Sequence, residues 1–199
     1  MIAENQIPEI NVHSFVDGRL SSSGFRITCL SERAMIDRLD EIMHFVNSIR
    51  VEYGERYGWK PEPREYFLNG LDRKWEFSYL IEEAATRKIA FIGLCSVYDN
   101  VLHLHCAYAA VDQRGMGLGR YYNLKTCQTG IEKGFSDIEG YWPKHNNGSL
   151  ILFLKMGYQI EDLRKSGTQL LLSANLAKSR DKTLAIILGK TNTIKPQGR

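Results

Sequence analysis

The sequence predicts a mixed α/β (α+β) fold, in which a mostly antiparallel sheet of about seven strands is flanked by helices. Two observations lead to this prediction. Segments that alternate apolar and polar residues are interspersed with segments of helical periodicity, and three of the strand-like segments follow one another with only short turns between them. The chain has 199 residues, 43% of them hydrophobic, which suffices for one core of ordinary size and hardly for two. We therefore expect residues 1–199 to form a single domain.

The first strand and the first long helix are expected between residues 25 and 49. Residues 25–30 alternate apolar and polar after Gly24, as a strand does, and Ser31 then offers a hydroxyl for an N-cap. Apolar residues follow at spacings of three and four, which gathers them along one side of a helix: Met35, Leu39, Ile42, Val46 and Ile49. A loop around Pro61 and Pro63 separates this helix from the next strands.

Three strands with short turns come after the proline loop, at residues 75–81, 89–98 and 101–110. The first turn is expected to hold Glu82, Glu83, Arg87 and Lys88, and the second Asp99 and Asn100. The remaining core elements are a helix, a strand, a short helix and two strands, at residues 118–133, 136–141, 148–156, 158–163 and 169–176.

The end of the chain has no clear place in this order. The core is expected to span residues 25–177, which leaves residues 178–199 as an extension with an apolar run at 184–188. We expect this extension to be either an extra strand or a segment that binds a partner.

The segment 111–120 is the most informative part of the sequence. Gly115, Gly117 and Gly119 alternate there between the end of a strand and the start of a helix. Without Cβ atoms the backbone can turn sharply and present successive N–H groups, and the first amides of a helix add partial positive charge. The segment therefore predicts a site for phosphate oxygens, bracketed by the full charges of Arg114 and Arg120.

Two other glycine motifs fit this segment less well. A Walker loop requires Gly-Lys-Ser or Gly-Lys-Thr, whereas Gly119 is followed by Arg120 and Tyr121. A dinucleotide fingerprint belongs to a parallel βαβ unit with an acidic residue about 20 residues further on, and neither the preceding antiparallel strands nor Glu139 matches it. A structural turn that binds no ligand is the remaining alternative.

The residues Arg114-Gly-Met-Gly117-Leu-Gly119 resemble the Arg/Gln-x-x-Gly-x-Gly signature of the GNAT superfamily of acyltransferases. Asn146-Asn-Gly-Ser149, followed by Gly157-Tyr158, resembles the second signature, and the element order over residues 25–177 is similar to the GNAT fold. The resemblance implies acetyl-CoA as co-substrate. It also implies the residues that would hold acetyl-CoA: Ala109, Ala110, Val111, Arg114, Gly115, Met116, Gly117, Leu118, Gly119, Arg120, Asn146 and Ser149.

These residues would have distinct roles in a GNAT protein. The amides of residues 115–120 would bind the pyrophosphate, the backbone of residues 109–111 would pair with the pantetheine arm, and Asn146 would touch that arm from the other side. These roles need backbone and amide groups rather than titratable ones.

His103 and His105 stand two residues apart on the strand before the glycine segment, so both side chains are expected on one face of the sheet. A His-x-His pair at this position resembles the arylalkylamine N-acetyltransferases, in which such a pair helps remove the proton of the amine. Two like charges so close would titrate together and keep one imidazole neutral near pH 7. Two histidines packed inside the sheet are the alternative, and a metal site is not expected because we find no third ligand.

Two further features bear on catalysis. Glu139 is a second candidate base on a neighbouring strand, or else a solvated strand charge. Phe153 stands where many GNAT members carry a tyrosine thought to protonate the leaving thiolate, and a phenyl ring has no proton to give. Tyr158 matches an aromatic packing position of the family, and Tyr141 is another hydroxyl that could reach the site.

A group of aromatic residues lies between the first long helix and the second strand, where this fold often shapes its acceptor pocket. They could flank an apolar or aromatic amine, or they could pack within the loop and the core: Tyr53, Tyr57, Trp59, Tyr66 and Phe67.

The resemblance predicts an N-acetyltransferase that moves an acetyl group from acetyl-CoA to the primary amine of a small molecule. A protein or an aminoacyl-tRNA as acceptor is the alternative within the same fold. A regulatory module that binds CoA without catalysis, motivated by Phe153, is the alternative outside the enzymes. The net charge of +3 is too small and scattered to predict a nucleic-acid partner, and a homodimer is left open.

The sequence also bears on the compartment. Its first 24 residues lack the basic-then-apolar pattern of a secretory signal, and nowhere do eighteen apolar residues run together. The four cysteines are widely spaced, with no Cys-x-x-Cys pair. We therefore expect a cytoplasmic protein with reduced thiols and no membrane partner.

Overall fold

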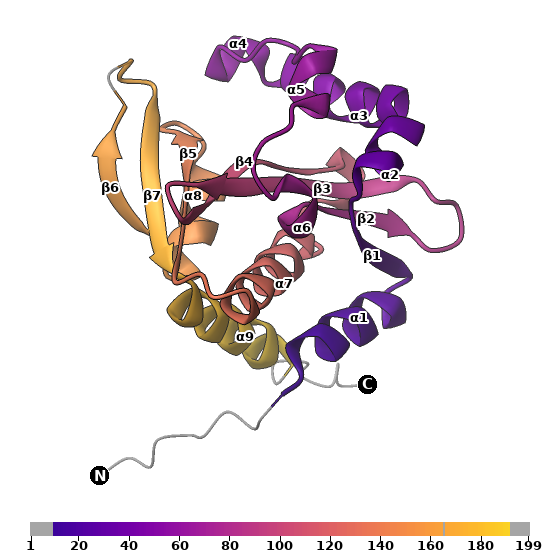
Figure 1. Cartoon of the computed structure of the whole chain (residues 1–199), viewed down its shortest axis with the longest axis vertical. Coiled ribbons are helices and arrows are strands. Elements are labelled where there is room, and N and C mark those ends of the chain that lie inside the picture. The colour runs from indigo at the N-terminus through magenta and orange to yellow at the C-terminus, as the bar shows by residue number, and fades with distance from the viewer. Residues whose placement is uncertain (1–9, 165, 192–199) are drawn as a thin grey trace, which may run out of the picture.

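The computed structural model describes residues 10–164 and 166–191. Within these residues, seven strands form one sheet in the order β1-β2-β3-β4-β5-β7-β6 (Figure 1), which confirms the expected fold class. All neighbouring strands are antiparallel except β4 and β5, which run parallel. The strands are β1 Phe25–Cys29, β2 Tyr79–Glu83, β3 Ile89–Tyr98, β4 Val101–Ala109, β5 Asp137–Pro143, β6 Gln159–Leu163 and β7 Gln169–Asn175.

The pairing between β4 and β5 is short. It joins residues 102–104 to residues 138–140. Beyond these residues β4 continues to Ala109 and β5 to Pro143, and no further pairing joins the two strands in the described part of the chain. The edge of β4 that faces β5 therefore has backbone groups without a sheet partner over residues 105–109, and such groups need another partner.

Helices cover both faces of the sheet (Figure 1). One face carries α2 Glu32–Asp37, α3 Leu39–Glu52, α4 Gly54–Tyr57 and α5 Arg64–Leu68, and the other carries α1 Val12–Ser22, α7 Leu118–Glu132 and α9 Leu176–Thr191. A separate apolar cluster lies under each layer of helices. Three further elements complete the described helices: α6 Lys74–Phe77, the 3-10 helix η1 Val111–Gln113 and α8 Asn147–Lys155.

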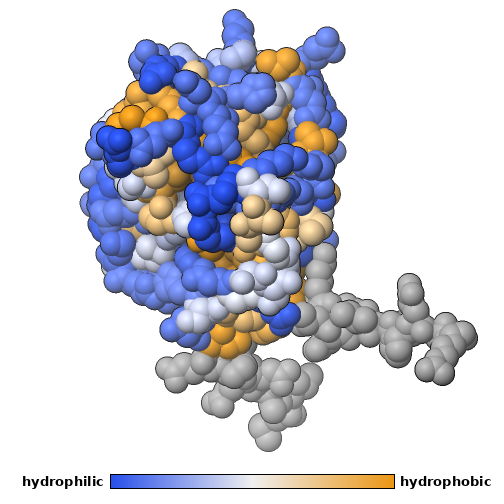
Figure 2. All heavy atoms as spheres, turned by 90° about the vertical axis from the view of Figure 1, so that its right-hand side faces the viewer, coloured by the Kyte–Doolittle hydropathy of each residue, from blue (hydrophilic) through white to orange (hydrophobic). Residues whose placement is uncertain are grey.

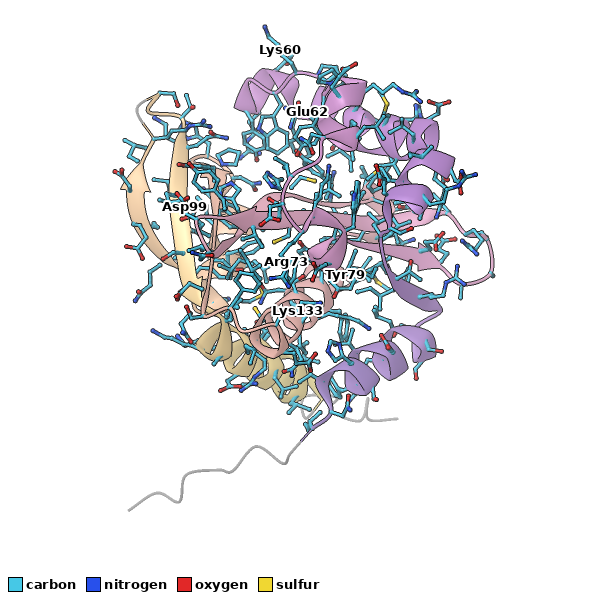
Figure 3. The ribbon with its side chains drawn as sticks, in the orientation of Figure 1. Lys60, Glu62, Arg73, Tyr79, Asp99 and Lys133 are labelled. Carbon is cyan, nitrogen blue, oxygen red and sulfur yellow. The ribbon has the colours of Figure 1, made fainter. Side chains whose placement is uncertain are left out.

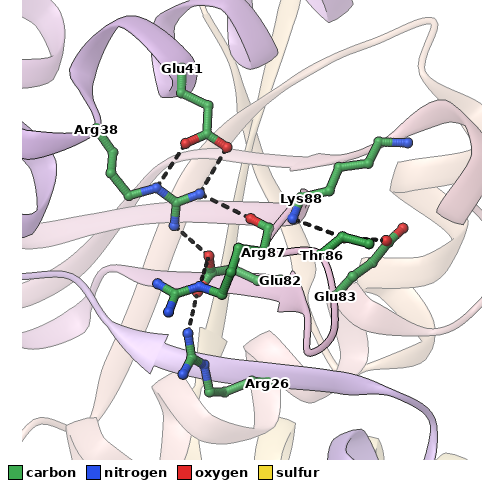
Figure 4. Close-up of polar contacts among 8 residues, drawn as sticks. All are labelled: Arg26, Arg38, Glu41, Glu82, Glu83, Thr86, Arg87 and Lys88. Atoms are coloured by element: carbon green, nitrogen blue, oxygen red, sulfur yellow. Dashed lines mark hydrogen bonds and ion pairs between the residues drawn. The ribbon is translucent and has the colours of Figure 1, made fainter.

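The single helix expected after Ser31 is in fact two helices, α2 and α3. The break falls at Arg38, whose φ of −120° and ψ of 18° lie outside helical geometry. The break directs the Arg38 guanidinium to Glu41 and to the buried carboxylate of Glu82 in β2 (Figure 4). The expected apolar stripe survives, because its members from both helices are buried together.

The second strand begins later than expected, because the residues before Tyr79 form the short helix α6. Lys74 lies in α6 with its side chain only 1% exposed. Its Nζ donates to the backbone oxygen of Phe67 at 2.9 Å and to Oδ1 of Asn69 at 2.7 Å. These bonds close a turn over residues 67–74. Glu82 and Glu83, both expected in the following turn, lie instead in β2.

The C-terminal extension is neither a strand nor a free segment over residues 178–191, which belong to α9. This helix packs against α7, and its Leu184 and Ile187 are buried in the same cluster as Leu176. The core therefore extends past residue 177, and it also includes α1, which the sequence analysis did not predict. Residues 192–199 of the expected extension lie outside the described residues.

Among the helices that the structure describes, none combines the length and the hydropathy that crossing a bilayer requires. The face shown in Figure 2 carries mostly hydrophilic side chains, with smaller apolar areas between them.

Candidate functional site

The glycine turn joins the end of β4 to the start of α7. It runs from Ala109 through η1 to Leu118, the first residue of α7. Gly115 and Gly117 have φ angles of +83° and +85°, in the left-handed region that strains residues with a Cβ atom. The turn therefore requires glycine at both positions.

Several backbone amides of this turn have no hydrogen-bond partner among the residues that the structure describes. The amides of Arg114, Met116 and Arg120 donate to backbone oxygens of the turn at 3.4, 3.3 and 2.9 Å. Among the described residues, nothing accepts from the amides of Gly115, Gly117, Leu118 and Gly119. These free donors lie at the N-terminus of a 15-residue helix, where partial positive charge favours an anion.

The two arginines of the turn have different surroundings. Two Arg114 nitrogens lie 3.2 Å from the two carboxylate oxygens of Glu52, and Arg114 also donates to the hydroxyl of Tyr53. Arg120 has no carboxylate partner in the described part of the chain, and its Nε is buried without a hydrogen-bond acceptor. A buried donor left unpaired costs about 1–3 kcal/mol. Arg120 is thus the residue of the turn that most needs an anionic ligand.

A cavity of about 450 Å³ opens at this turn. Most of the expected cofactor residues line it: Ala109, Arg114, Gly115, Gly117, Leu118, Gly119, Arg120, Asn146 and Ser149. Ala110, Val111 and Met116 do not. Ala110 is buried, and its amide donates to Ala90 of β3 at 2.9 Å, whereas Val111 and Met116 point to solvent.

A smaller cavity of about 100 Å³ lies where β4 and β5 separate. Residues from both strands line it, among them His105, Tyr141 and Trp142. It adjoins the larger cavity, because five residues line both: Trp59, Ala107, Tyr108, Asn146 and Ser149. A ligand held at the glycine turn therefore has a continuous path to His105.

A β-bulge places His105 in this position. In the register of β3 and β4, Leu94 lies opposite Cys106 and Cys95 lies opposite Leu104, so His105 is an extra residue in β4. The bulge shifts the alternation of side chains. Leu104 packs in the cluster under α7, whereas Cys106 packs in the cluster under α3.

The two histidines lie on one face of the sheet, with ring centroids 5.0 Å apart. Their partners differ: Nε2 of His105 lies 2.7 Å from Oγ of Ser96, and Nδ1 of His103 lies 3.0 Å from Oε1 of Glu139. Burial and the nearby charges of His103 and Lys74 lower the pKa of His105 to about 4. His105 is therefore neutral at pH 7, and it lines the smaller cavity, whereas His103 lines neither cavity.

The residues around Phe153 are mostly apolar. Phe153 lines the larger cavity and packs on Trp142 and Tyr158, with ring centroids 4.6 and 4.9 Å away. Tyr158 is buried in the core, and its hydroxyl donates to Oδ1 of Asn123 at 2.9 Å. Tyr158 is thus a packing residue with its proton already engaged. Tyr141 lines the smaller cavity, with its ring centroid 5.8 Å from that of His103.

The aromatic residues considered as an acceptor pocket divide into two groups. Tyr53, Tyr57 and Trp59 line the larger cavity and pack on one another, with ring centroids 5.0–6.2 Å apart. Tyr66 and Phe67 line neither cavity, and pack edge to face at 5.2 Å against the cluster under α3. Only the first group is placed to contact a ligand.

The structure adds two residues that the sequence analysis did not single out. Arg50 of α3 donates to the backbone oxygen of Lys60 and to the hydroxyl of Tyr108, and pairs with Glu62 at 2.7 Å. Figure 3 shows Lys60 and Glu62 on the side of the sheet that carries α3. Tyr108 lies on that side because the bulge at His105 reverses the alternation along β4. Strict alternation from His103 would have placed Tyr108 on the opposite face.

The described side chains do not meet the requirements of a metal site. In residues 10–164 and 166–191, no group of three His, Cys, Asp or Glu side chains is arranged to hold a metal ion.

No protein-family model matches the sequence, and no curated protein matches it. A GNAT-family acetyltransferase from Staphylococcus aureus Mu50 has a similar structure, with a TM-score of 0.62 and 13% identity over 76% of this chain and 99% of that chain. The ribosomal-protein-S18-alanine N-acetyltransferase from Escherichia coli has a TM-score of 0.58 and 13% identity over 76% and 94% of the chains. The PaiA N-acetyltransferase from Thermoplasma acidophilum, in complex with coenzyme A, has a TM-score of 0.57 and 15% identity over 76% and 98%. The chain therefore has the GNAT fold.

Proposed function

We propose that the protein is an N-acetyltransferase that transfers an acetyl group from acetyl-CoA to the primary amine of a small molecule. The observation that carries this proposal is the glycine turn, which combines unpartnered amides, a helix N-terminus and the unpaired Arg120 at the mouth of a cavity. The GNAT fold, shared with acetyltransferases that include one in complex with coenzyme A, supports the same function.

The residues of the turn fit a diphosphate. Gly119 has no positive φ, and a Cβ added to it would make only ordinary contacts, at 3.6 Å with Phe91 and 3.9 Å with Leu152. The fold alone therefore does not require glycine there, although glycine in a helix costs about 1 kcal/mol relative to alanine. Close approach of a ligand to the amide is a reason to keep it. Arg120 would supply the full positive charge.

The chemistry at the smaller cavity fits amine acetylation. His105 is neutral at pH 7 and can accept a proton from the attacking amine, if Nε2 donates to Ser96 and Nδ1 keeps its lone pair. The ring of His103 lies next to His105 and pairs with the carboxylate of Glu139. His103 can therefore pass the proton on towards solvent. Holding amine and thioester side by side supplies several kcal/mol more.

The linings of the two cavities favour one class of acceptor. Tyr53, Tyr57, Trp59 and Tyr108 present aromatic surface, and within the described residues no acidic side chain lines either cavity. A polyamine carries a second ammonium group that would need a carboxylate, so an amine with an aromatic or apolar body fits better. A protein N-terminus, the substrate type in the name of the Escherichia coli enzyme, is the second candidate.

The experiment has two arms. Release of free thiol from acetyl-CoA, measured with a panel of arylalkylamines, polyamines and N-terminal peptides, tests the reaction and ranks the acceptors. Isothermal titration with CoA tests the turn. We expect Gly119→Ala to weaken CoA binding about ten-fold, the equivalent of one hydrogen bond to a charged group, while stabilising the fold by about 0.5 kcal/mol.

Gly18→Ala is the matched control. Gly18 is an exposed glycine inside α1 with no atom near a new Cβ, so alanine there should stabilise the helix and leave CoA affinity unchanged. Unchanged affinity in Gly119→Ala, or CoA binding without thiol release for every amine, would contradict the proposed function.

A further inference from the structure

The proposed acetyl transfer releases a thiolate, and Phe153 cannot protonate it. Within the described residues, the hydroxyl groups that line the two cavities belong to Tyr53, Tyr57, Tyr108, Tyr141 and Ser149. Phenols, with a pKa near 10 in water, are the stronger acids of this set. The phenol that protonates the leaving sulfur must lie next to it, where the two cavities meet.

We propose that the hydroxyl of Tyr108 donates the proton to the leaving thiolate and that Arg50 is the positioning residue that holds this hydroxyl in place. The proposal rests on the proposed function, and it assigns the missing general acid to β4 rather than to α8.

Position favours Tyr108 over the other phenols. It is the only tyrosine of the described chain that lines both cavities, so it stands at their junction. It lies between Ala107 and Ala109, on the part of β4 that does not pair with β5 and whose backbone is free for the pantetheine arm. Tyr53 and Tyr57 line only the larger cavity, and Tyr141 lines only the smaller one.

Hydrogen bonding leaves the phenol hydrogen of Tyr108 available to the sulfur. Nη1 of Arg50 donates to its oxygen at 2.9 Å, and because arginine is only a donor, the phenol hydrogen is not used in this bond. No other described residue accepts that hydrogen. The ring itself is held edge-on against Trp59, with centroids 5.7 Å apart. The Tyr53 oxygen likewise accepts from an arginine, Arg114, so the two phenols differ in position: Tyr53 lines only the larger cavity, whereas Tyr108 lines both.

Arg50 is fully engaged, which suits a positioning role. Its Nε donates to the backbone oxygen of Lys60, its Nη1 to Tyr108, and its Nη2 pairs with Glu62. The guanidinium is thus fixed from three directions and has no free fork for a substrate carboxylate. It can, however, stabilise the negative charge that forms on the Tyr108 oxygen.

The proton and electron balance of the step is complete. The amine nitrogen forms a bond to the thioester carbonyl carbon, and the carbon–sulfur bond breaks with its electron pair on sulfur. The Tyr108 O–H proton moves to that sulfur and yields the thiol, which leaves a tyrosinate beside Arg50. The proton that the amine gives to His105 leaves towards solvent, and the Tyr108 oxygen takes up a proton from water, so both side chains regain their resting states.

The protonation state of Tyr108 suits a donor. Burial raises the pKa of Tyr108, while the charge and the hydrogen bond of Arg50 oppose the rise. The phenol therefore keeps its proton at neutral pH until a strong acceptor such as a thiolate forms next to it.

The first test is Tyr108→Phe, which removes one oxygen from a tightly packed ring. We expect kcat for thiol release to fall about 100-fold, within the range of general acid catalysis, with little change in the KM for acetyl-CoA. Introducing Phe153→Tyr into the Tyr108→Phe variant should restore part of the loss, because it returns a phenol to the other wall of the cavity.

A second readout does not depend on turnover. Isothermal titration at pH 9 compares the affinity of CoA with that of desulfo-CoA, which lacks the sulfur. A phenol that donates to the thiolate should make the wild-type protein prefer CoA about ten-fold, and Tyr108→Phe should abolish this preference.

Tyr79→Phe is the matched control. The Tyr79 hydroxyl is buried and lies 2.7 Å from Oγ1 of Thr129, among the side chains between the sheet and α7 (Figure 3). This variant should lower the melting temperature and leave kcat unchanged. If Tyr108→Phe does not fold, Arg50→Lys provides the alternative test, because lysine cannot hold three partners in a fork, and kcat should fall about ten-fold.

The outcomes separate the two proposals. Thiol release by the wild type with an unchanged kcat in Tyr108→Phe, or a larger loss in Tyr141→Phe, would overturn the role of Tyr108 and leave the proposed function intact. No thiol release by the wild type would overturn the proposed function, while the comparison of CoA with desulfo-CoA would still decide whether Tyr108 contacts the sulfur.

Discussion

Two groups of arginines in this protein differ in how their charge is balanced. At β2, Arg26, Arg38 and Arg87 all contact the carboxylate of Glu82, which is 1% exposed (Figure 4). At the glycine turn, Arg120 has no carboxylate among the described residues, and its Nε is buried without an acceptor. The first group shares a buried carboxylate and ties α2, β1 and β2 together. The second leaves positive charge beside a cavity.

The number of arginines in a region therefore says little about the function of that region. The partners of the arginines decide the function. Three arginines that share a carboxylate form a structural cluster, whereas a single arginine without a carboxylate partner is available to a ligand. Substitutions at the two sites should therefore affect different properties. A substitution of Glu82 should lower the stability of the fold, and a substitution of Arg120 should lower the affinity for CoA.

The largest expected effect is at Glu82. Glu82→Gln removes the charge that three arginines share, and we expect the free energy of unfolding to fall by about 3 kcal/mol, as for other broken buried ion pairs. Urea denaturation measures the loss, and CoA affinity should not change. Arg87→Met is the control, because its side chain is 59% exposed and should cost less than about 1 kcal/mol. A loss below that value in Glu82→Gln would remove the contrast.

The next effect is at Arg120. Arg120→Gln should weaken CoA binding about 30-fold in isothermal titration, because a charged hydrogen bond to the diphosphate is lost. The free energy of unfolding should stay the same or rise, since a buried unpaired donor is removed. Arg114→Gln should weaken binding less, about three-fold, because its charge is already paired with Glu52. The opposite ranking of the two variants would contradict our assignment.

The smallest effect extends the comparison to the histidines, of which His103 has a carboxylate partner and His105 has none in the described residues. The pKa of His105 is about 4 in the folded protein and near 6.5 when unfolded. The unfolded state therefore binds the proton first, and stability present above pH 6.5 is lost as the pH falls towards 4. When the pH falls from 7 to 5, the melting temperature of His105→Gln should decrease by about 3 °C less than that of the wild type.

His103→Gln is the control for this pH dependence. If it flattens the dependence as much as His105→Gln does, the coupling of the two rings rather than the burial of His105 controls the titration. A wild-type melting temperature that does not change over this range would contradict the buried state of His105.

Much of the fold could be predicted because its signals are local. Alternation identified β1, short turns delimited β3 and β4, glycine spacing identified the turn before α7, and helical periodicity identified the apolar stripe from Met35 to Ile49. The elements that were wrong or missed depend on distant partners. The break at Arg38 follows its contact with Glu82, 44 residues away, and α9 is held by packing on α7.

The same division holds in the candidate site. The pair of histidines on one face followed from a spacing of two, and the glycines at Gly115 and Gly117 from the backbone conformation that a sharp turn needs. The bulge that places His105 in the cavity and Tyr108 beside it depends on the register of β3 and β4. A bulge adds one residue to a strand, and this changes the composition and periodicity of the sequence too little to be detected.

By itself, the sequence determined where the chain must bend, which segments extend and where free amides gather, because these properties depend on neighbours along the chain. Only the tertiary structure decided which charges are neutralised. Glu52 and Arg114 are 62 residues apart, and Arg50 and Tyr108 are 58 apart. A side chain is free for a ligand only when folding has supplied it with no partner, and that depends on contacts in space, which no local pattern encodes.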